Sequence, residues 1–208
     1  MKYFIIGDIH GCYYTMRKML EFRNPHENLV ILGDIVHKGK HSFKTLSYLL
    51  NLQKNQPDKI VVLKGNNEYL FEQYYRRNFS IYAQKMFKKY NLDYNKTLDW
   101  LRLLPHYMES KHIFISHAGV DIDNKDDLEI DELSVIFTKK KLRDVQKVQF
   151  LGHLVYDEPY LDEDANAWYI DTGAGFGKKL TGAKVNEQGE ILEFISLELD
   201  ERDAFEDD

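Results

Sequence analysis

The sequence predicts an α/β fold built around a largely parallel sheet. Three strand-like runs, "KYFIIGDIHG", "ENLVILGDIVHKG" and "DKIVVLKGNNE", each reach a glycine that is followed by polar side chains. Helical patterns separate these runs, at Tyr14–Glu21 and Ser42–Leu52. Strands that alternate with helices are typical of βαβ units, and ligands of open α/β sheets bind at the carboxyl ends of the strands. We therefore expect the polar residues after each run to form a site.

The remaining elements follow in chain order. Residues 68–104 carry many aromatic side chains at helical spacing and predict a helical insertion that forms a cap or wall. Strands are expected at "KHIFISHAG", "KVQFLGH" and "NAWYIDTGAGFG", and "KLTGAKVNEQGEILEFISL" predicts a hairpin that turns at Gln188-Gly189. A single domain is expected over 1–199, and the acidic segment 200–208 is expected to be disordered.

The composition is that of one globular domain, with 208 residues of which 43% are hydrophobic and 30% charged. The formal net charge of -6 argues against general nucleic-acid binding. The lone cysteine, Cys12, excludes an internal disulfide and suits a reducing cytosol. No apolar run approaches the roughly 20 residues of a membrane span, and the N-terminal run is too short for a signal peptide. A soluble cytoplasmic protein without a membrane partner is expected.

Six side chains with nitrogen or oxygen donors stand at the predicted strand ends, and they are Asp8, His10, Asp34, Asn66, His117 and His153. Imidazole and carboxylate ligands suit manganese, iron or zinc, and manganese is our first expectation. Six ligands are too many for one ion that keeps an open position, so the set favours two ions about 3.5–4 Å apart. Asp34 is the expected bridge, and Asn66 supplies a neutral oxygen that limits the negative charge.

The two ions would be shared between the remaining donors. Asp8 and His10 would complete the first site, whereas Asn66, His117 and His153 would complete the second. A water held between such ions has its pKa lowered toward about 7 and becomes a hydroxide that can attack phosphorus in line. The sequence thus predicts a dinuclear centre that cleaves phosphoester bonds.

The ordered set "GDIHG", "GDIVHKG", "GNNE", "HAG" and "GH" resembles the metallophosphoesterases, specifically their phosphoprotein-phosphatase branch. That branch includes serine/threonine phosphatases, calcineurin, small bacterial and phage phosphatases and symmetrical diadenosine tetraphosphatases. The family pattern is GDxHG, GDxVDRG, GNHE and two later histidines, and the match runs from Gly7 to about Gly177. The resemblance implies a four-layer αββα sandwich and a metal-dependent phosphoesterase.

Three residues depart from the family pattern. His37 and Lys38 stand where the family has Asp-Arg, and Asn67 stands where GNHE has its histidine. In the family that histidine protonates the leaving alkoxide, the Asp orients it and the Arg grips the phosphate. We expect Lys38 and Asn67 to contact phosphoryl oxygens, and His37, held by Asn67, is a candidate replacement acid. The alternative is that His37 lies in a surface loop and Asn67 is a turn residue.

Two further cations are candidates for substrate binding. Lys139 stands about where many family members carry a second phosphate-binding Arg, and Arg143 is the other candidate. The alternative for Lys139–Lys141 is a solvated helix face.

Loss of the general acid bears on the substrate. Such an acid typically contributes about 10²–10⁴-fold to rate, so its absence favours leaving groups of low pKa, as in anhydrides, diesters and aryl phosphates. Three functions therefore compete. The first is a serine/threonine or tyrosine protein phosphatase. The second is a small-molecule hydrolase of phosphodiesters or dinucleoside polyphosphates. The third is a metal-binding pseudophosphatase that recognises phosphorylated partners without turning them over.

Overall fold

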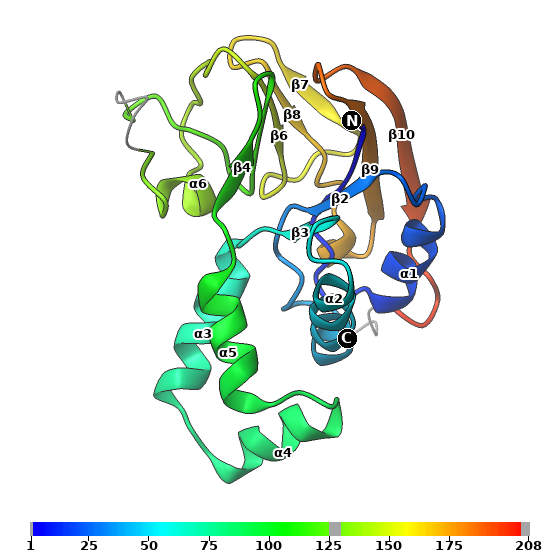
Figure 1. The fold of residues 1–208 in the computed structure, drawn as a ribbon, viewed down its shortest axis with the longest axis vertical. Helices are drawn as coiled ribbons and strands as arrows, with labels where there is room; N and C mark the ends of the chain where they lie inside the picture. Colours follow the sequence, from blue (N-terminus) through cyan, green and yellow to red (C-terminus); the bar gives the residue numbers. More distant parts are fainter. Residues whose placement is uncertain (1, 125–129, 205–208) are drawn as a thin grey trace.

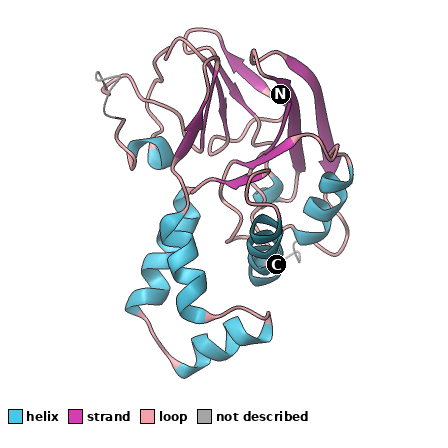
Figure 2. Cartoon of the chain, viewed as in Figure 1, coloured by secondary structure: helices cyan, strands magenta, loops and turns pink. Residues whose placement is uncertain are grey.

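The computed structural model describes residues 2–124 and 130–204, and these form two five-stranded sheets (Figures 1 and 2). The first sheet has the order β10-β9-β1-β2-β3. Its strands are β1 (Lys2–Ile6), β2 (Asn28–Ile31), β3 (Ile60–Val62), β9 (Lys179–Asn186) and β10 (Ile191–Glu198). Strands β1, β2 and β3 are parallel, whereas β9 runs antiparallel to both β1 and β10.

The second sheet has the order β4-β5-β6-β8-β7. Its strands are β4 (Tyr107–Glu109), β5 (Ile113–Ser116), β6 (Val148–Leu151), β7 (Tyr160–Asp162) and β8 (Ala167–Tyr169). Strands β5, β6 and β8 are parallel, and the two edge strands are antiparallel. The expected parallel pairing holds for β1, β2 and β3 and for β5, β6 and β8, whereas β9 and β10 in the first sheet and the edge strands β4 and β7 of the second pair antiparallel. Short connections such as the predicted hairpin, which forms as β9 and β10, can join only antiparallel neighbours.

Strand β1 is apolar at successive positions because both of its faces are buried. Tyr3 and Ile5 face the second sheet and pack in one apolar cluster with Phe150, whereas Phe4 and Ile6 face the opposite way into a second cluster. Side chains alternate between the faces of a strand, so a strand covered on both faces is apolar at every position. The two sheets thus pack against each other and the first sheet is also covered from outside.

Helices cover the outer faces and complete the predicted αββα sandwich. Helices α1 (Tyr13–Glu21) and α2 (Ser42–Asn55) pack on the first sheet, close to where both were expected. The second sheet is covered more thinly within the described ranges, by α6 (Ser134–Phe137) and loops, with Val135 and Ile136 packed on Phe114. A short 3-10 helix, η1 (Ala174–Phe176), precedes β9.

The predicted helical insertion is an arm of three helices that projects from the sandwich (Figure 1). They are α3 (Asn66–Arg77), α4 (Ile81–Lys89) and α5 (Tyr94–Leu103). Aromatic side chains hold the arm together, with the ring of Phe87 4.8 Å from that of Tyr94 and 5.2 Å from that of Tyr75. The aromatic richness of this segment therefore builds a small core at the junction with α2. Over residues 2–124 and 130–204 no helix combines the length and apolar character needed to cross a lipid bilayer.

The expectation of disorder over 200–208 is wrong for its first five residues, and residues 205–208 lie outside the described part of the chain. Asp203 is buried and accepts hydrogen bonds from the backbone N–H of Tyr14 (3.2 Å) and of Thr15 (2.7 Å). Asp200 forms an ion pair of 2.8 Å with Lys18. The first turn of a helix leaves N–H groups without partners, and Cys12 at the start of α1 offers no side-chain acceptor. The acidic segment supplies that acceptor and is ordered by it.

Candidate metal centre

The carboxyl ends of strands from both sheets meet at one place, and the structure brings all six predicted donors there. Asp8 and His10 follow β1, Asp34 follows β2, Asn66 opens α3 after β3, His117 follows β5 and His153 follows β6. Asp8, His10, Asp34 and His117 are each at most 3% exposed. The cluster joins residues that are far apart in the sequence. Asp8 and His153 are 145 positions apart, and the backbone N–H of His153 donates to Asp8 Oδ2.

His10 and His117 both lie close to the carboxylates of Asp8 and Asp34. His10 Nε2 is 3.6 Å from Asp34 Oδ2 and 3.9 Å from Asp8 Oδ2. His117 Nε2 is 3.5 Å from Asp34 Oδ1. With Nδ1 protonated, His10 donates to Val36 O at 3.3 Å and His117 donates to Leu32 O at 3.1 Å. Each bond leaves Nε2 unprotonated and directed into the cluster, which is the form that ligates a metal.

Asn66 joins the two later histidines. Its Oδ1 lies 3.0 Å from His117 Nε2 and 3.0 Å from His153 Nδ1. The rings of His117 and His153 are 5.0 Å apart. Asn66, His117 and His153 thus lie together, and His117 places them next to Asp34.

Orphaned polar atoms show that this cluster fits a cation. Asp8 Oδ1 and His153 Nε2 are buried without a hydrogen-bond partner among the residues that the structure describes. Asp8, Asp34 and His117 each offer a ligand atom within 4.8 Å of the others. Burying such groups unpaired is costly, and buried charges are normally paired or bound to metals. Carboxylate, imidazole and amide donors are also the chemistry that divalent manganese, iron and zinc accept.

The electrostatics of the cluster favour the neutral form of two of its histidines, His10 and His153. Burial is the main cause that lowers the pKa of His10 and of His153 to about 4, and the neighbouring His117 lowers both further. Burial raises the pKa of Asp8, and so do Asp171 and Asp34. Burial alone would also raise the pKa of Asp34, but His117 and His10 beside it, with hydrogen bonds from Asn67, lower it. Positive charge is therefore what the bare cluster lacks.

Glycines and unusual backbone conformations let the donors approach one another. A Cβ on Gly152 would lie 1.9 Å from Asp8 Oδ1, and one on Gly65 would lie 2.3 Å from Asp34 Oδ1. His10, Asp34 and His153 themselves adopt positive φ angles of 48°, 45° and 66°. Such strained conformations in non-glycine residues cluster at functional sites, where the surrounding structure compensates for their cost.

Glu68, the last residue of "GNNE", organises the loop that carries Asp34, a role the sequence analysis did not assign. Its carboxylate is fully buried and accepts backbone N–H groups of Asp34 (2.6 Å), Ile35 (2.9 Å), Val36 (3.2 Å) and Gly65 (2.9 Å). Burial chiefly raises its pKa, to about 8, and Asp34 adds to the effect. The signal was present, because a glutamate three residues after a helix-starting glycine has capping-box spacing.

Asn67 holds Asp34 from the side. Its backbone N–H donates to Asp34 Oδ1 at 2.9 Å and its side-chain amide donates to Asp34 Oδ2 at 2.5 Å. His37 is exposed and has a φ of 75°, and its backbone N–H donates to Ser42 Oγ at 3.0 Å. The amide of Asn67 is thus engaged by Asp34, and His37 and Asn67 line the same pocket beside the centre.

The predicted phosphate-binding cations lie in different places. Lys38 lies beside the donor cluster, with its Nζ 3.5 Å from the ring centroid of Phe176. Burial is the main cause of the low pKa of His10, and the charge of Lys38 lowers that pKa further. Lys139 is exposed, and its charge contributes to the low pKa of His153 after burial and His117. Helix α6 ends at Phe137, so Lys139–Lys141 belong to a loop and the alternative of a solvated helix face is wrong.

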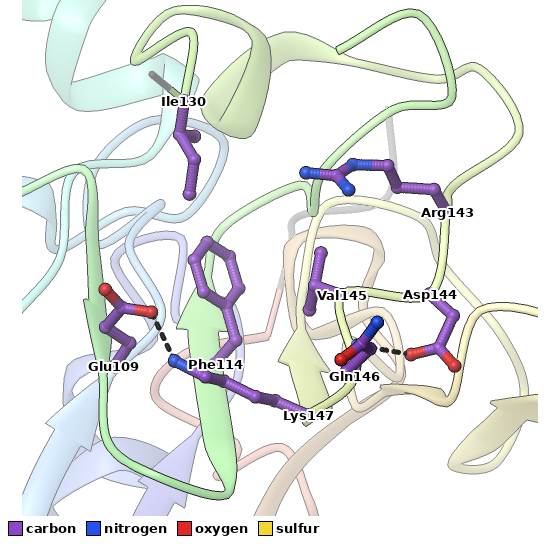
Figure 3. A pocket seen from close by; sticks show the side chains of 8 residues that line it. All are labelled: Glu109, Phe114, Ile130, Arg143, Asp144, Val145, Gln146 and Lys147. Atoms are coloured by element: carbon purple, nitrogen blue, oxygen red, sulfur yellow. Dashed lines mark hydrogen bonds and ion pairs between the residues drawn. The ribbon is translucent and has the colours of Figure 1, made fainter. Parts of the chain in front are cut away.

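Arg143 lies away from the donors. It lines a separate pocket of about 220 Å³ with Phe114 and Val145 (Figure 3). At the rim of that pocket Lys147 donates to Glu109 at 2.6 Å. This pocket adjoins the amino-terminal ends of β5 and β6, opposite the ends that carry His117 and His153. A role for Arg143 in phosphate binding at the donor cluster has no support in this arrangement.

The structure thus gathers Asp, His and Asn donors, four of them buried, at the strand ends of an αββα sandwich. Residues 1–175 match the model of the calcineurin-like phosphoesterases, and the chain belongs to that family. Membership of this family identifies the chain as a phosphoric-ester hydrolase.

Solved structures share the fold at low sequence identity. A candidate diadenosine tetraphosphatase has a TM-score of 0.71 at 19% identity, over 95% of this chain and 93% of that chain. A protein serine/threonine phosphatase from Saccharomyces cerevisiae, with similarity to human phosphatase PP5, has a TM-score of 0.67 at 14% identity, over 97% and 81%. A cold-active protein-tyrosine phosphatase of a Shewanella species has a TM-score of 0.62 at 15% identity, over 92% and 80%.

Proposed function

We propose that the six donors bind two divalent metal ions, manganese first and iron or zinc as alternatives, and that the protein hydrolyses phosphoesters with them. The observation that carries this proposal is the buried, uncompensated Asp8 Oδ1 beside Asp34 and His117. Asp34, held from several sides and flanked by both donor groups, is the residue best placed to be shared between the ions.

The chemistry divides between the ions and the side chains. Two divalent ions held by these residues would make an attacking water more acidic and would offset the negative charge that develops on a phosphoryl group. Asn67 and Glu68 keep Asp34 and its loop in place through hydrogen bonds. Lys38 is the cation that we assign to the phosphoryl oxygens, with Lys139 further out, and His37 is the candidate proton donor to a leaving group. Lys38 binds as a point charge, because an ammonium lacks the planar fork that grips phosphate in two places.

The substrate that we propose is a phosphomonoester with a leaving group of low pKa, on a protein or on a small molecule. Asn67 supports this choice, since its carboxamide N–H is too weakly acidic to protonate a leaving group and donates to Asp34. The same observation supports a second candidate, cleavage of a dinucleoside polyphosphate, whose leaving group is a phosphate. A structural neighbour bearing the name of a diadenosine tetraphosphatase agrees with that candidate.

The cytosol is the compartment that we propose. Cys12 is a free and buried thiol, as a reducing compartment allows. Fractionation of cells that express the tagged full-length chain tests this placement, and recovery in an oxidising compartment would contradict it.

Elemental analysis and a substrate panel test the central proposal. We expect close to two manganese ions per chain, with hydrolysis of an aryl phosphate exceeding that of phosphoserine. Asp34→Asn is expected to reduce both metal content and turnover by more than the about 10–100-fold typical of an outer-shell change. Asp164→Asn, which alters an exposed carboxylate paired with Lys141, is the matched control and should change neither.

Three results of that panel are informative. Metal-loaded protein that hydrolyses neither aryl phosphate, phosphopeptide, bis-aryl phosphate nor diadenosine tetraphosphate would overturn the enzymatic proposal in favour of the pseudophosphatase. Preference for diadenosine tetraphosphate would favour the second candidate. Absence of metal uptake would remove the basis of both.

A further inference from the structure

An apolar pocket of about 440 Å³ opens beside the donor cluster, between the start of α2 and the first turns of α3. Phe43, Leu70, Phe71 and Tyr74 form much of its wall, and His37, Ser42 and Asn67 are polar residues that line it. A pocket of this size with mostly aromatic walls and a few polar groups has the character of a small-molecule site.

The aromatic wall is held rigidly from behind. Phe43 stacks on Tyr90 at 5.7 Å with an interplanar angle of 17° and meets the edges of Phe71 and Phe87. Phe71 in turn lies 4.6 Å from Tyr75. Because helices α2, α3 and α4 all contribute rings, the wall is preformed, and a ligand would not have to order it. Leu70 and Tyr74 are 51% and 60% exposed at the mouth.

Asn67 connects the pocket to the donor cluster. The same residue lines the pocket and hydrogen-bonds Asp34. A phosphoryl group held next to Asp34 therefore lies one side chain away from the pocket. The substituent that is attached directly to that phosphoryl group is the part of the substrate within reach of the aromatic wall.

Building on the proposed function, we propose that this pocket binds the aromatic ring of the leaving group, so that the preferred substrates are aryl phosphomonoesters, the tyrosyl phosphate side chain among them. Aromatic rings pair favourably in offset and edge-to-face arrangements, which Phe71 and Tyr74 can offer to a phenyl ring. The rest of a phosphotyrosyl peptide would pass out of the pocket mouth between Leu70 and Tyr74.

Hydrolysis of such a substrate does not require a strong acid to protonate the leaving group. The oxygen of a water forms a bond to phosphorus while the bond between phosphorus and the aryl oxygen breaks, and the aryl oxygen leaves with the electron pair. The products are inorganic phosphate and a phenol, which takes its proton from solvent or from His37. A phenol has a pKa of about 10, so its oxide leaves far more readily than the alkoxide of serine. The ring-binding pocket and the amide at Asn67 therefore select the same kind of leaving group.

Two variants of exposed residues test the pocket in the manganese-loaded protein. Leu70→Trp fills the mouth and is expected to lower kcat/KM for phosphotyrosine and phenyl phosphate by about tenfold or more. Tyr74→Ala removes one ring and is expected to lower it by roughly threefold to tenfold, mainly through KM. Acetyl phosphate, which has a good leaving group but no ring, should be hydrolysed within about twofold of wild type by both variants. Tyr82→Ala, at a tyrosine that is 74% exposed and outside the pocket lining, is the control.

Binding gives a readout that is independent of turnover. Calorimetry with the zinc-loaded protein should show that phenylphosphonate binds at least about tenfold more tightly than methylphosphonate, and Leu70→Trp should remove that difference.

Each outcome has a distinct meaning. Equal binding of the two phosphonates, or aryl turnover that Leu70→Trp leaves unchanged, would overturn the pocket assignment while acetyl phosphate hydrolysis leaves the proposed function standing. Larger effects of the variants on diadenosine tetraphosphate than on phosphotyrosine would assign the pocket to a nucleobase and would also overturn the aryl proposal. A wild-type protein that neither takes up metal nor hydrolyses acetyl phosphate would overturn both proposals.

Discussion

Asn67 is the residue whose substitution is expected to change most strongly which leaving groups the protein can release. Asn67 donates two hydrogen bonds to Asp34, one from its backbone N–H and one from its side-chain amide. It also lines the pocket where the leaving group is expected. An imidazole at this position would retain the backbone bond and add a group that can protonate a departing oxygen.

Asn67→His is expected to raise kcat for phosphoserine by about 10²-fold or more relative to its effect on an aryl phosphate, because a general acid typically contributes about 10²–10⁴-fold and aryl oxides need it least. Steady-state rates on the two substrates measure this. Asn67→Ala is the control that removes the amide without adding an acid. An unchanged ratio, together with a His37→Ala variant that loses phosphoserine turnover, would instead show that His37 already protonates the leaving group.

Cys12 behaves as a small buried residue. Its thiol lies 3.5 Å from Ala174 O and is fully buried, and burial is the main cause that raises its pKa to about 12. We expect no reaction of the folded protein with a thiol reagent such as dithionitrobenzoate at pH 8, and one thiol per chain to react once urea unfolds it. Rapid labelling of the folded protein would contradict this burial.

At the scale of elements, helix α1 is stabilised by residues from the other end of the chain. Asp203 bonds both backbone N–H groups at its start and also accepts the hydroxyl of Thr15 at 2.8 Å. The hydroxyl oxygen of Thr15 accepts in turn the N–H of Asp200 at 2.9 Å. Because α1 begins directly after the loop of Asp8 and His10, the C-terminal segment supports the element that carries the first donors.

Asp203→Ala is expected to lower the free energy of unfolding by about 1–3 kcal/mol, since it removes a helix cap and leaves buried donors unpaired. Urea unfolding of the full chain measures the change. Glu201→Ala, in the same segment but exposed, is the matched control. Equal stabilities of the two variants would show that the segment docks without stabilising α1.

At the scale of the molecule, the two sheets converge on a cluster in which carboxylates gather without a counter-charge. Asp8, Asp34, Glu68 and Asp171 all lie close enough to influence one another, and burial with the charge of Asp34 raises the pKa of Glu68. The bare protein therefore carries repulsion between carboxylates where the two sheets meet, and a bound divalent cation would relieve it.

Manganese at 100 times its dissociation constant is expected to raise the free energy of unfolding by about 2.7 kcal/mol over protein treated with a chelator. Thermal or urea unfolding in the two conditions measures this. Asp34→Asn should lose most of the difference, and magnesium at the same concentration should stabilise less because nitrogen donors suit it poorly. A chelator that leaves the midpoint unchanged would argue against a metal that links the sheets.

Much of the fold and of the donor set was predictable because local sequence determines both. Buried strands leave apolar runs, turns at strand ends need glycine, and donors such as Asp34 and His117 stand directly after those runs. The helices of the arm were visible in their spacing. Glu68 was also within a recognised motif, and helix-capping rules would have assigned it.

Other features depend on contacts between segments that are far apart in the chain. The antiparallel pairing of β1 with β9, the place of Arg143 in a separate pocket, and the hydrogen bond from Thr15 to Asp203 arise only when distant strands and helices pack. The pocket beside the centre likewise needs Phe43 from α2 and Phe71 from α3 to share one wall. Sequence by itself determined which donors this protein offers, because strand ends and their turns are local. Tertiary structure alone decided what surrounds them, because that depends on which faces meet when apolar surface is buried.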